Sequence, residues 1–261
     1  MYIPENISMQ LPGGQFSLDN IGRSDAQVMI FEDRVLKVEN DCNVSANEAA
    51  MMRWLDGRLM VPKVIETACE EGLRYLLMSR ISGKYLCDDA VLDDQDLLAY
   101  LVAEGLRSLW TVDVSSCPTD RSLNAKYIEI EEGLRSGAIT LDSARQDETY
   151  GPGGFASPAE LFDWLVKNRP AKELVLSHGD FCLPNIFCDR KKLTGIIDLG
   201  YAGAADKWVD IEKVVWSMWA NTTGQFGGKK RPFDRQKLFD ALKMEPDEER
   251  LRYYSLLSEL C

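Results

Sequence analysis

Short apolar runs alternate with turn signals along the first eighty residues, a pattern typical of β structure. Polar turns at residues 32–34 and 70–72 separate neighbouring runs, as they do in hairpins. Residues 45–60, between the third and fourth runs, have apolar positions at helical spacing. The predicted strands are residues 15–18, 28–31, 35–38, 62–65 and 75–78. The pattern therefore predicts a β-sheet accompanied by one major helix.

From residue 79 onward, the pattern changes to longer segments with helical periodicity. Residues 79–83 break the strand pattern and are interpreted as a hinge. Residues 141–155 are acidic and then glycine-rich, which predicts a loop. The predicted helices are residues 96–112, 127–136, 158–167, 206–221, 233–243 and 248–260. We therefore expect an N-terminal lobe over residues 1–80 and a helical lobe over residues 81–261.

Two further apolar runs, residues 174–176 and 193–197, are predicted strands, and each is followed by polar residues. The pattern H-x-D-x-x-x-x-N followed by D-x-G is the layout of kinase-type phosphoryl transfer. It places two carboxylates and an amide at strand ends, which suits Mg²⁺ because this ion takes a few protein oxygens together with phosphates and waters. The residues that form the pattern are His178, Asp180, Asn185, Asp198 and Gly200.

Each acidic or amide residue of this pattern has a functional and a structural interpretation. Asp180 is the candidate that orients the substrate hydroxyl and receives its proton; alternatively, it forms a turn after a strand. Asn185 and Asp198 are the candidate magnesium ligands. Asn185 can also brace its loop through hydrogen bonds.

Lys37 and Glu48 each allow two interpretations from the residues alone. Lys37 lies inside a predicted strand, where it either decorates an edge or points into a cleft. Glu48 follows Ser45 by three residues, so the two can form a capping box at the start of the helix. Alternatively, Glu48 pairs with Lys37, as kinases pair a strand lysine with a glutamate of the next helix.

The rest of the chain contributes few competing motifs. No Walker-type loop and no kinase G-x-G-x-x-G is present, so only Gly22 and Ser24, in a turn-rich stretch, remain to contact phosphate. His178 is the only histidine, and no G-x-S-x-G elbow accompanies it. We therefore interpret His178 as a structural brace of the catalytic loop.

Composition and charge exclude several functional classes. The net charge of −12 disfavours nucleic acid and anionic membranes as partners. It serves either general solubility or a pocket for a polycationic substrate. The seven cysteines include no Cys-x-x-Cys, which argues against a zinc site or a disulfide framework. Without a signal peptide or membrane-length apolar stretch, the sequence predicts a cytoplasmic protein. The oligomeric state stays open.

Residues 178–187 (HGDFCLPNIF) and 195–212 (GIIDLGYAGAADKWVDIE) closely resemble the aminoglycoside phosphotransferases, especially the 3′-phosphotransferase branch. Residues 51–64, 76–83 and 252–260 also look like that branch, so the resemblance covers nearly the whole chain. It implies an α+β, bilobal protein-kinase-like fold. The N-terminal lobe would be an antiparallel β lobe with one major helix, and the C-terminal lobe would be mainly helical.

The resemblance also assigns roles by position. Asp180 would be the catalytic base, and Asn185 and Asp198 would hold Mg²⁺. The nucleotide would be ATP, with GTP as the alternative. It would be contacted by Ser24, Lys37 paired with Glu48, the backbone from Met78 to Arg80, Phe187 and Ile197. The cationic amino-sugar substrate would be contacted by Asp147, Glu148, Glu259 and the terminal carboxylate of Cys261.

The activity that the resemblance implies is phosphorylation of an aminoglycoside hydroxyl, at the 3′ position, which confers antibiotic resistance. Two alternatives stay open. One is a metabolic kinase of the same superfamily that acts on choline, an amino sugar, a fructosamine or a macrolide. The other is a catalytically silent kinase-like binding protein. Leu183, Tyr201 and Cys261 depart from residues common in the branch, and all three are expected on the acceptor side.

Overall fold

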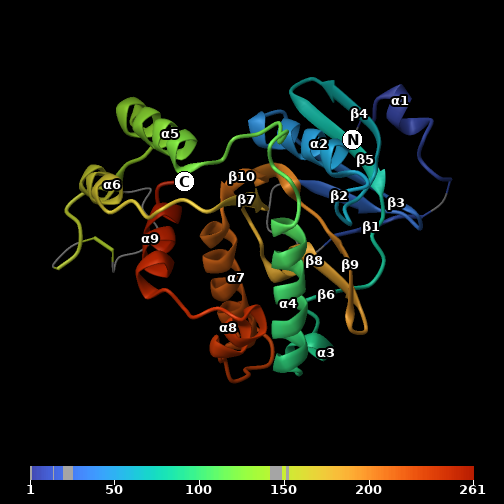
Figure 1. Cartoon of the computed structure of the whole chain (residues 1–261). Coiled ribbons are helices and arrows are strands. Elements are labelled where there is room, and N and C mark those ends of the chain that lie inside the picture. Colours follow the sequence, from blue (N-terminus) through green and yellow to red (C-terminus); the bar gives the residue numbers. More distant parts are fainter. Residues whose placement is uncertain (1, 14, 20–25, 142–148, 151–152) are drawn as a thin grey trace.

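The computed structural model describes residues 2–13, 15–19, 26–141, 149–150 and 153–261 (Figure 1). Its N-terminal part is a five-stranded antiparallel sheet with strand order β1-β2-β3-β5-β4. The strands are β1 (Ser17–Leu18), β2 (Gln27–Ile30), β3 (Arg34–Asn40), β4 (Val64–Glu70) and β5 (Leu73–Ser79). The predicted strands are confirmed in number and order. The last two are longer than predicted, because they continue almost to the turn that joins them.

Both faces of this sheet are covered. Leu36 and Val38 belong to a small apolar cluster with Ile7 of the short helix α1 (Glu5–Ser8), which the sequence pattern did not predict. Side chains alternate along a strand, so Lys37 points to the opposite face. Lys37 pairs with Val28 and Leu76 in the ladder, so it lies in a central strand and does not decorate an edge.

Helix α2 (Asn43–Leu55) is the one major helix of this part, as predicted, but its start differs from the prediction. Cys42 is the N-cap, and the Ser45 hydroxyl accepts a hydrogen bond from the Cys42 N–H at 2.9 Å. The interpretation of Ser45 and Glu48 as a capping box is therefore wrong, because the helix is capped three residues before Ser45. As a consequence, Glu48 is not part of a capping box, and its carboxylate is available to another partner.

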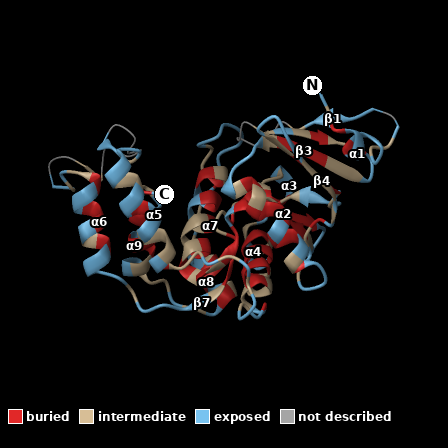
Figure 2. Cartoon of the chain, turned by 90° about the horizontal axis from the view of Figure 1, so that it is seen from above, coloured by how far each residue is buried: buried red, intermediate tan, exposed pale blue. Residues whose placement is uncertain are grey.

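The remainder of the chain is mainly helical, with α4 and α7 at its centre (Figure 1). The large apolar core gathers around them, and the buried residues concentrate there while α5 and α6 expose much of their surface (Figure 2). The helices are α3 (Asp89–Leu92), α4 (Gln95–Trp110), α5 (Leu123–Ser136), α6 (Pro158–Lys167), α7 (Lys207–Thr222), α8 (Gln236–Leu242) and α9 (Glu248–Ser258). Every predicted helix is present, with ends shifted by a few residues.

Two small sheets lie between the N-terminal sheet and these helices. The predicted strands of this region correspond to β7 (Leu174–Ser177) and β9 (Lys192–Ile196). Their partners were not predicted: β10 pairs with β7, and β8 lies between β6 and β9. These partners are β6 (Lys84–Tyr85), β8 (Ile186–Asp189) and β10 (Gly203–Asp206). The loop after β7 and the turn after β9 are thereby held at both ends.

The architecture confirms the α+β fold class, with an antiparallel sheet and one major helix followed by a mainly helical remainder. All seven cysteines are free thiols. Within the described ranges, the helices are too short or too polar to span a lipid bilayer.

Candidate active site

Lys37 of β3, Glu48 of α2 and Asp198 after β9 meet although they are far apart in the sequence. The Lys37 ammonium lies 2.7 Å from Glu48 Oε2, 3.1 Å from Asp198 Oδ1 and 3.3 Å from Glu39 Oε1. Lys37 and Glu48 are buried. The predicted Lys37–Glu48 ion pair is therefore present, and Lys37 points into the cleft between the sheet and the helical part.

The charge of Lys37 is maintained by its neighbours. Burial alone lowers the pKa of Lys37, but the carboxylates of Glu48, Asp198 and Glu39 outweigh this effect and hold the pKa above its ordinary value. Burial also raises the pKa of Glu48, and the Lys37 ammonium opposes that shift. The cleft thus contains a firmly charged cation, which suits a phosphate group.

Asp198 occupies a strained backbone position. Its φ of 63° and ψ of 60° lie in the left-handed region, which few residues other than glycine adopt. The adjacent Ile197 donates its N–H to the Asn185 carbonyl at 2.9 Å, so the turn after β9 is tied to the loop before β8. This arrangement keeps the side chains of Asn185 and Asp198 at the same cavity.

The loop between β7 and β8 presents the Asp180 carboxylate. Oδ2 of Asp180 accepts a hydrogen bond from Asn185 Nδ2 at 3.3 Å, and Oδ1 accepts one from the Cys182 thiol at 3.3 Å. Asn185 Nδ2 also donates to the Asp180 carbonyl at 3.0 Å. The amide nitrogen of Asn185 is therefore engaged, and its oxygen remains available to a cation. Burial raises the pKa of Cys182, and the Asp180 charge raises it further, so the thiol keeps its proton.

The donor set fits Mg²⁺ better than a transition metal. In the described part of the chain, no group of three or more His, Cys, Asp and Glu side chains is arranged to hold a metal ion. Asn185 and Asp198 instead offer one amide and one carboxylate oxygen at the cavity edge. Mg²⁺ is bound through one or two such groups together with phosphate oxygens and waters.

His178 braces the catalytic loop, as interpreted from the sequence. It is fully buried. Its Nδ1 accepts a hydrogen bond from the Asp180 N–H at 3.2 Å, so its Nε2 carries the proton and donates to the Ile197 carbonyl at 2.8 Å. His178 thereby connects the segment of Asp180 to the segment of Asp198, and it has no free nitrogen for catalysis.

Asp210 of α7 is a positioning residue that the sequence interpretation missed. It is fully buried, and its carboxylate accepts hydrogen bonds from the N–H groups of His178 and Gly179, each at 2.9 Å. Gly179 has a φ of 78°, and an added Cβ would lie 2.4 Å from the Tyr201 carbonyl oxygen. The available signal was an acid between Val209 and Ile211 in an amphipathic helix, which indicates a buried carboxylate that requires partners.

We expect Asp210→Ala to lower the free energy of unfolding by about 2–5 kcal/mol, because two buried N–H groups lose their acceptor. Burial raises the pKa of Asp210 in the folded protein. The stability that such a group contributes is greatest below its unfolded pKa of about 4 and declines as the pH rises through the folded pKa. The deficit of the variant in urea unfolding should therefore be larger at pH 4, near the unfolded pKa, than at pH 8. Equal deficits would contradict the raised pKa.

A cavity of about 410 Å³ adjoins these groups. The predicted nucleotide residues Lys37, Glu48, Met78, Arg80, Phe187 and Ile197 all line it, together with Asn185 and Asp198. Its walls also include residues that the sequence interpretation did not name: Val28, Ile30, Val35, Ile81, Tyr85 and Pro184. The ring centroids of Tyr85 and Phe187, both at the wall of the cavity, lie 4.3 Å apart. The cavity is thus apolar at one side and charged at the other, as a nucleotide requires.

Two backbone N–H groups of the predicted hinge already have partners within the protein. The N–H of Ser79 donates to the Lys63 carbonyl at 2.9 Å, and the N–H of Arg80 donates to the Asp33 carbonyl at 3.0 Å. Both donors are therefore occupied. Within the described ranges, the N–H of Ile81 has no partner and is the first backbone donor of the hinge available to a ligand.

The predicted acceptor residues are only partly placed. Asp147 and Glu148 lie outside the described residues, as does the predicted phosphate contact Ser24. Glu259, at the end of α9, accepts a hydrogen bond on Oε1 from the Thr149 hydroxyl at 2.5 Å. Its Oε2 is buried and unpartnered in the described part. Burial raises the pKa of Glu259.

The three departures from the family pattern fall into different environments. Leu183 is 0% exposed and belongs to the apolar core, so the expectation that it faces the acceptor is wrong. Tyr201 is 50% exposed, and its Cβ lies beside Gly179, next to Asp180. Cys261 is exposed at the end of the chain, beyond α9. Tyr201 is therefore the departure that can meet an acceptor beside the base.

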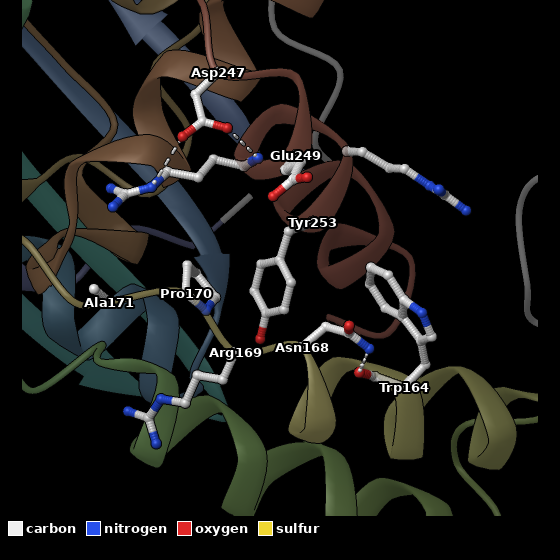
Figure 3. A pocket seen from close by; sticks show the side chains of 10 residues that line it. Trp164, Asn168, Arg169, Pro170, Ala171, Asp247, Glu249 and Tyr253 are labelled. Carbon is white, nitrogen blue, oxygen red and sulfur yellow. Dashed lines mark hydrogen bonds and ion pairs between the residues drawn. The ribbon is translucent and has the colours of Figure 1, made fainter.

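A second cavity, of about 460 Å³, lies between α6 and α9 (Figure 3). It contains none of the predicted site residues, and several of its polar groups bind one another. Asp247 pairs with Arg250, and Asn168 donates to the Trp164 carbonyl (Figure 3). The chemistry of the protein is therefore assigned to the cavity beside Lys37 and Asp198.

Known phosphotransferases are similar to this protein over most of the chain. The model of the phosphotransferase enzyme family matches residues 19–254. An aminoglycoside 3′-phosphotransferase of Enterococcus faecalis is 37% identical over 215 residues, which cover 82% of this chain and 77% of that protein. One of Staphylococcus aureus is also 37% identical, with coverages of 82% and 78%.

Solved structures of aminoglycoside phosphotransferases have the same fold. The crystal structure of an aminoglycoside-3′-phosphotransferase of type VIII superposes with a TM-score of 0.76 at 25% identity, and covers 98% of this chain and 97% of the other. A Streptomyces rimosus aminoglycoside phosphotransferase, solved with ADP and streptomycin, shares the fold with a TM-score of 0.67 at 22% identity; the match covers 95% of this chain and 94% of that one. The chain therefore belongs to the phosphotransferase enzyme family and, within it, to the aminoglycoside phosphotransferases.

Proposed function

We propose that this protein transfers the γ-phosphate of ATP to the 3′ hydroxyl of an aminoglycoside and thereby confers resistance. The observation that carries the proposal is the convergence of Asn185 and Asp198 with the Lys37–Glu48 pair at one cavity, with the Asp180 carboxylate hydrogen-bonded to Asn185 beside it. A carboxylate for the hydroxyl, oxygens for a cation and a cation for phosphates are the parts that phosphoryl transfer needs. The 37% identical relatives named aminoglycoside 3′-phosphotransferases support the acceptor class.

Each residue has one role in the proposed reaction. Asp180 orients the acceptor hydroxyl in line with the phosphate and receives its proton. Lys37 contacts the nucleotide phosphates while Glu48 holds its ammonium in place. Asn185 and Asp198 hold Mg²⁺, which neutralises charge on the phosphates when bound. His178 and Asp210 keep the loop of Asp180 in position.

The nucleotide occupies the 410 Å³ cavity in this proposal. Its base lies between the apolar wall of Tyr85 and Phe187 and the hinge, where the N–H of Ile81 donates a hydrogen bond. The Streptomyces rimosus relative was solved in complex with ADP, which supports a nucleotide as ligand. GTP is the alternative donor. We place the lobe boundary at residue 80, directly after β5, and the activity in the cytoplasm, where ATP is available.

The acceptor approaches Asp180 from the side of Tyr201 and the C-terminal helix. Carboxylates on this side attract the ammonium groups of an amino sugar. Glu259 is the described candidate, and Asp147 and Glu148 of the acidic segment are the others. The net charge of −12 favours the approach of a polycation.

A coupled assay of ADP release tests the acceptor and the position of transfer together. We expect kanamycin B to be phosphorylated, and tobramycin, which differs from it in lacking the 3′ hydroxyl, to show only background ADP release. Comparable turnover of both would contradict 3′ transfer. Failure with all aminoglycosides, but turnover of choline, a fructosamine or a macrolide, would favour the metabolic-kinase alternative.

A further inference from the structure

Asp180 receives a second hydrogen bond that the proposed mechanism has not used. The Cys182 thiol donates to Oδ1 of Asp180 at 3.3 Å, while Asn185 donates to Oδ2. The backbone makes this contact possible, because the Cys182 N–H bonds the Asp180 carbonyl at 2.8 Å and turns the chain back on itself. Each carboxylate oxygen therefore has one protein donor and keeps a lone pair for an acceptor hydroxyl.

The segment that carries the thiol is anchored on both sides by α7. Before it, Asp210 binds the N–H groups of His178 and Gly179. After it, the Leu183 N–H donates to the Ser217 hydroxyl at 3.0 Å. Residues 180–182 thus lie between two fixed points, so the thiol can hold the carboxylate in one orientation.

The two donors on Asp180 are not equivalent. Asn185 is also a proposed magnesium ligand, and its amide nitrogen is shared between the carboxylate and the carbonyl of Asp180. Cys182 has no proposed metal role. Its thiol donates to the Asp180 carboxylate, and the Ser217 hydroxyl of α7 is hydrogen-bonded to its sulfur. The thiol proton is therefore directed to the base.

We propose that Cys182 is a positioning residue for the reaction: its thiol holds the Asp180 carboxylate in the plane from which it meets the acceptor hydroxyl. The inference rests on the proposed function, in which Asp180 is the base. A misplaced base lowers the rate of the chemical step but leaves nucleotide binding unchanged.

Cys182→Ala and Cys182→Ser separate this role from simple packing. We expect Cys182→Ala to lower kcat about three- to tenfold with the KM for ATP unchanged, since a thiol is a weak donor. Cys182→Ser keeps a donor and should recover kcat to within about twofold of wild type. Cys188→Ala, which removes a buried thiol of β8, is the matched control and should leave kcat unchanged. A serine variant as slow as the alanine variant would overturn the proposal.

A double variant gives the decisive result. If Cys182 acts through Asp180, then Cys182→Ala should lower kcat no further, to within about twofold, in an Asp180→Asn background. An equal fold loss in both backgrounds would show a general structural effect and overturn the proposal.

If wild type phosphorylates no aminoglycoside, the proposed acceptor class fails. The same cycle is then measured on the transfer of phosphate to water, in which Asp180 would receive a proton of the attacking water.

Discussion

Asp180→Asn should lower kcat for aminoglycoside phosphorylation by about 10²- to 10⁴-fold, the range that positioned general bases contribute. The substitution keeps the shape of the side chain and its hydrogen bond to Asn185, but it removes the atom that accepts the hydroxyl proton. The KM for ATP should stay close to that of wild type, because Asp180 does not line the nucleotide cavity. Steady-state kinetics with kanamycin and ATP measures both quantities.

Asp189→Asn is the matched control for this experiment. Asp189 is an exposed aspartate at the end of β8, so its substitution makes the same chemical change outside the cavity. Its kcat should equal that of wild type. Turnover of Asp180→Asn within about tenfold of wild type would show that another group receives the proton.

Asp198→Asn should lower kcat/KM for ATP by at least about 100-fold, because it removes the only carboxylate among the two proposed magnesium ligands. Asparagine tolerates the left-handed backbone that Asp198 adopts, so the substitution tests the charge and spares the turn. The thermal shift of the protein on addition of Mg-ATP should be lost as well, since that shift measures binding to the native state.

The dependence on Mg²⁺ concentration distinguishes a metal ligand from a simple contact to the nucleotide. In Asp198→Asn, the Mg²⁺ concentration for half-maximal rate should rise at least about tenfold. An unchanged Mg²⁺ dependence, together with a reduced rate, would show that Asp198 acts only through its ion pair with Lys37. Asp189→Asn again provides the control.

Local sequence patterns were sufficient where the structural signal is itself local. Hydrophobic periodicity predicted the sheet, its single major helix and the helices that follow, because burial of one face imposes a fixed period on each element. The spacing of Asp180, Asn185 and Asp198 predicted their convergence, since short loops after strands hold such residues within reach of one another. The structural role of His178 was inferred because it is the only histidine and no hydrolase motif accompanies it.

Contacts between distant segments required the tertiary structure. Glu48 had a local interpretation as a capping residue, and only the approach of β3 to α2 shows that its partner is Lys37. Asp210 is separated from the loop it supports by about thirty residues. Arg80 lies in the expected hinge, but its N–H donates to the Asp33 carbonyl. The hinge donor available to a ligand is therefore the N–H of Ile81.

Residue types at the strand ends and their spacing can be read along the chain, and they were enough to indicate the family and its phosphoryl transfer. Which side chains share that site, and how they are charged, depends on the folded arrangement. Leu183 is buried in the core while Tyr201 lies beside the base, although both belong to the same motif region. The reason is physical: burial and pairing depend on what packs against a residue, and most of those neighbours are remote in the chain.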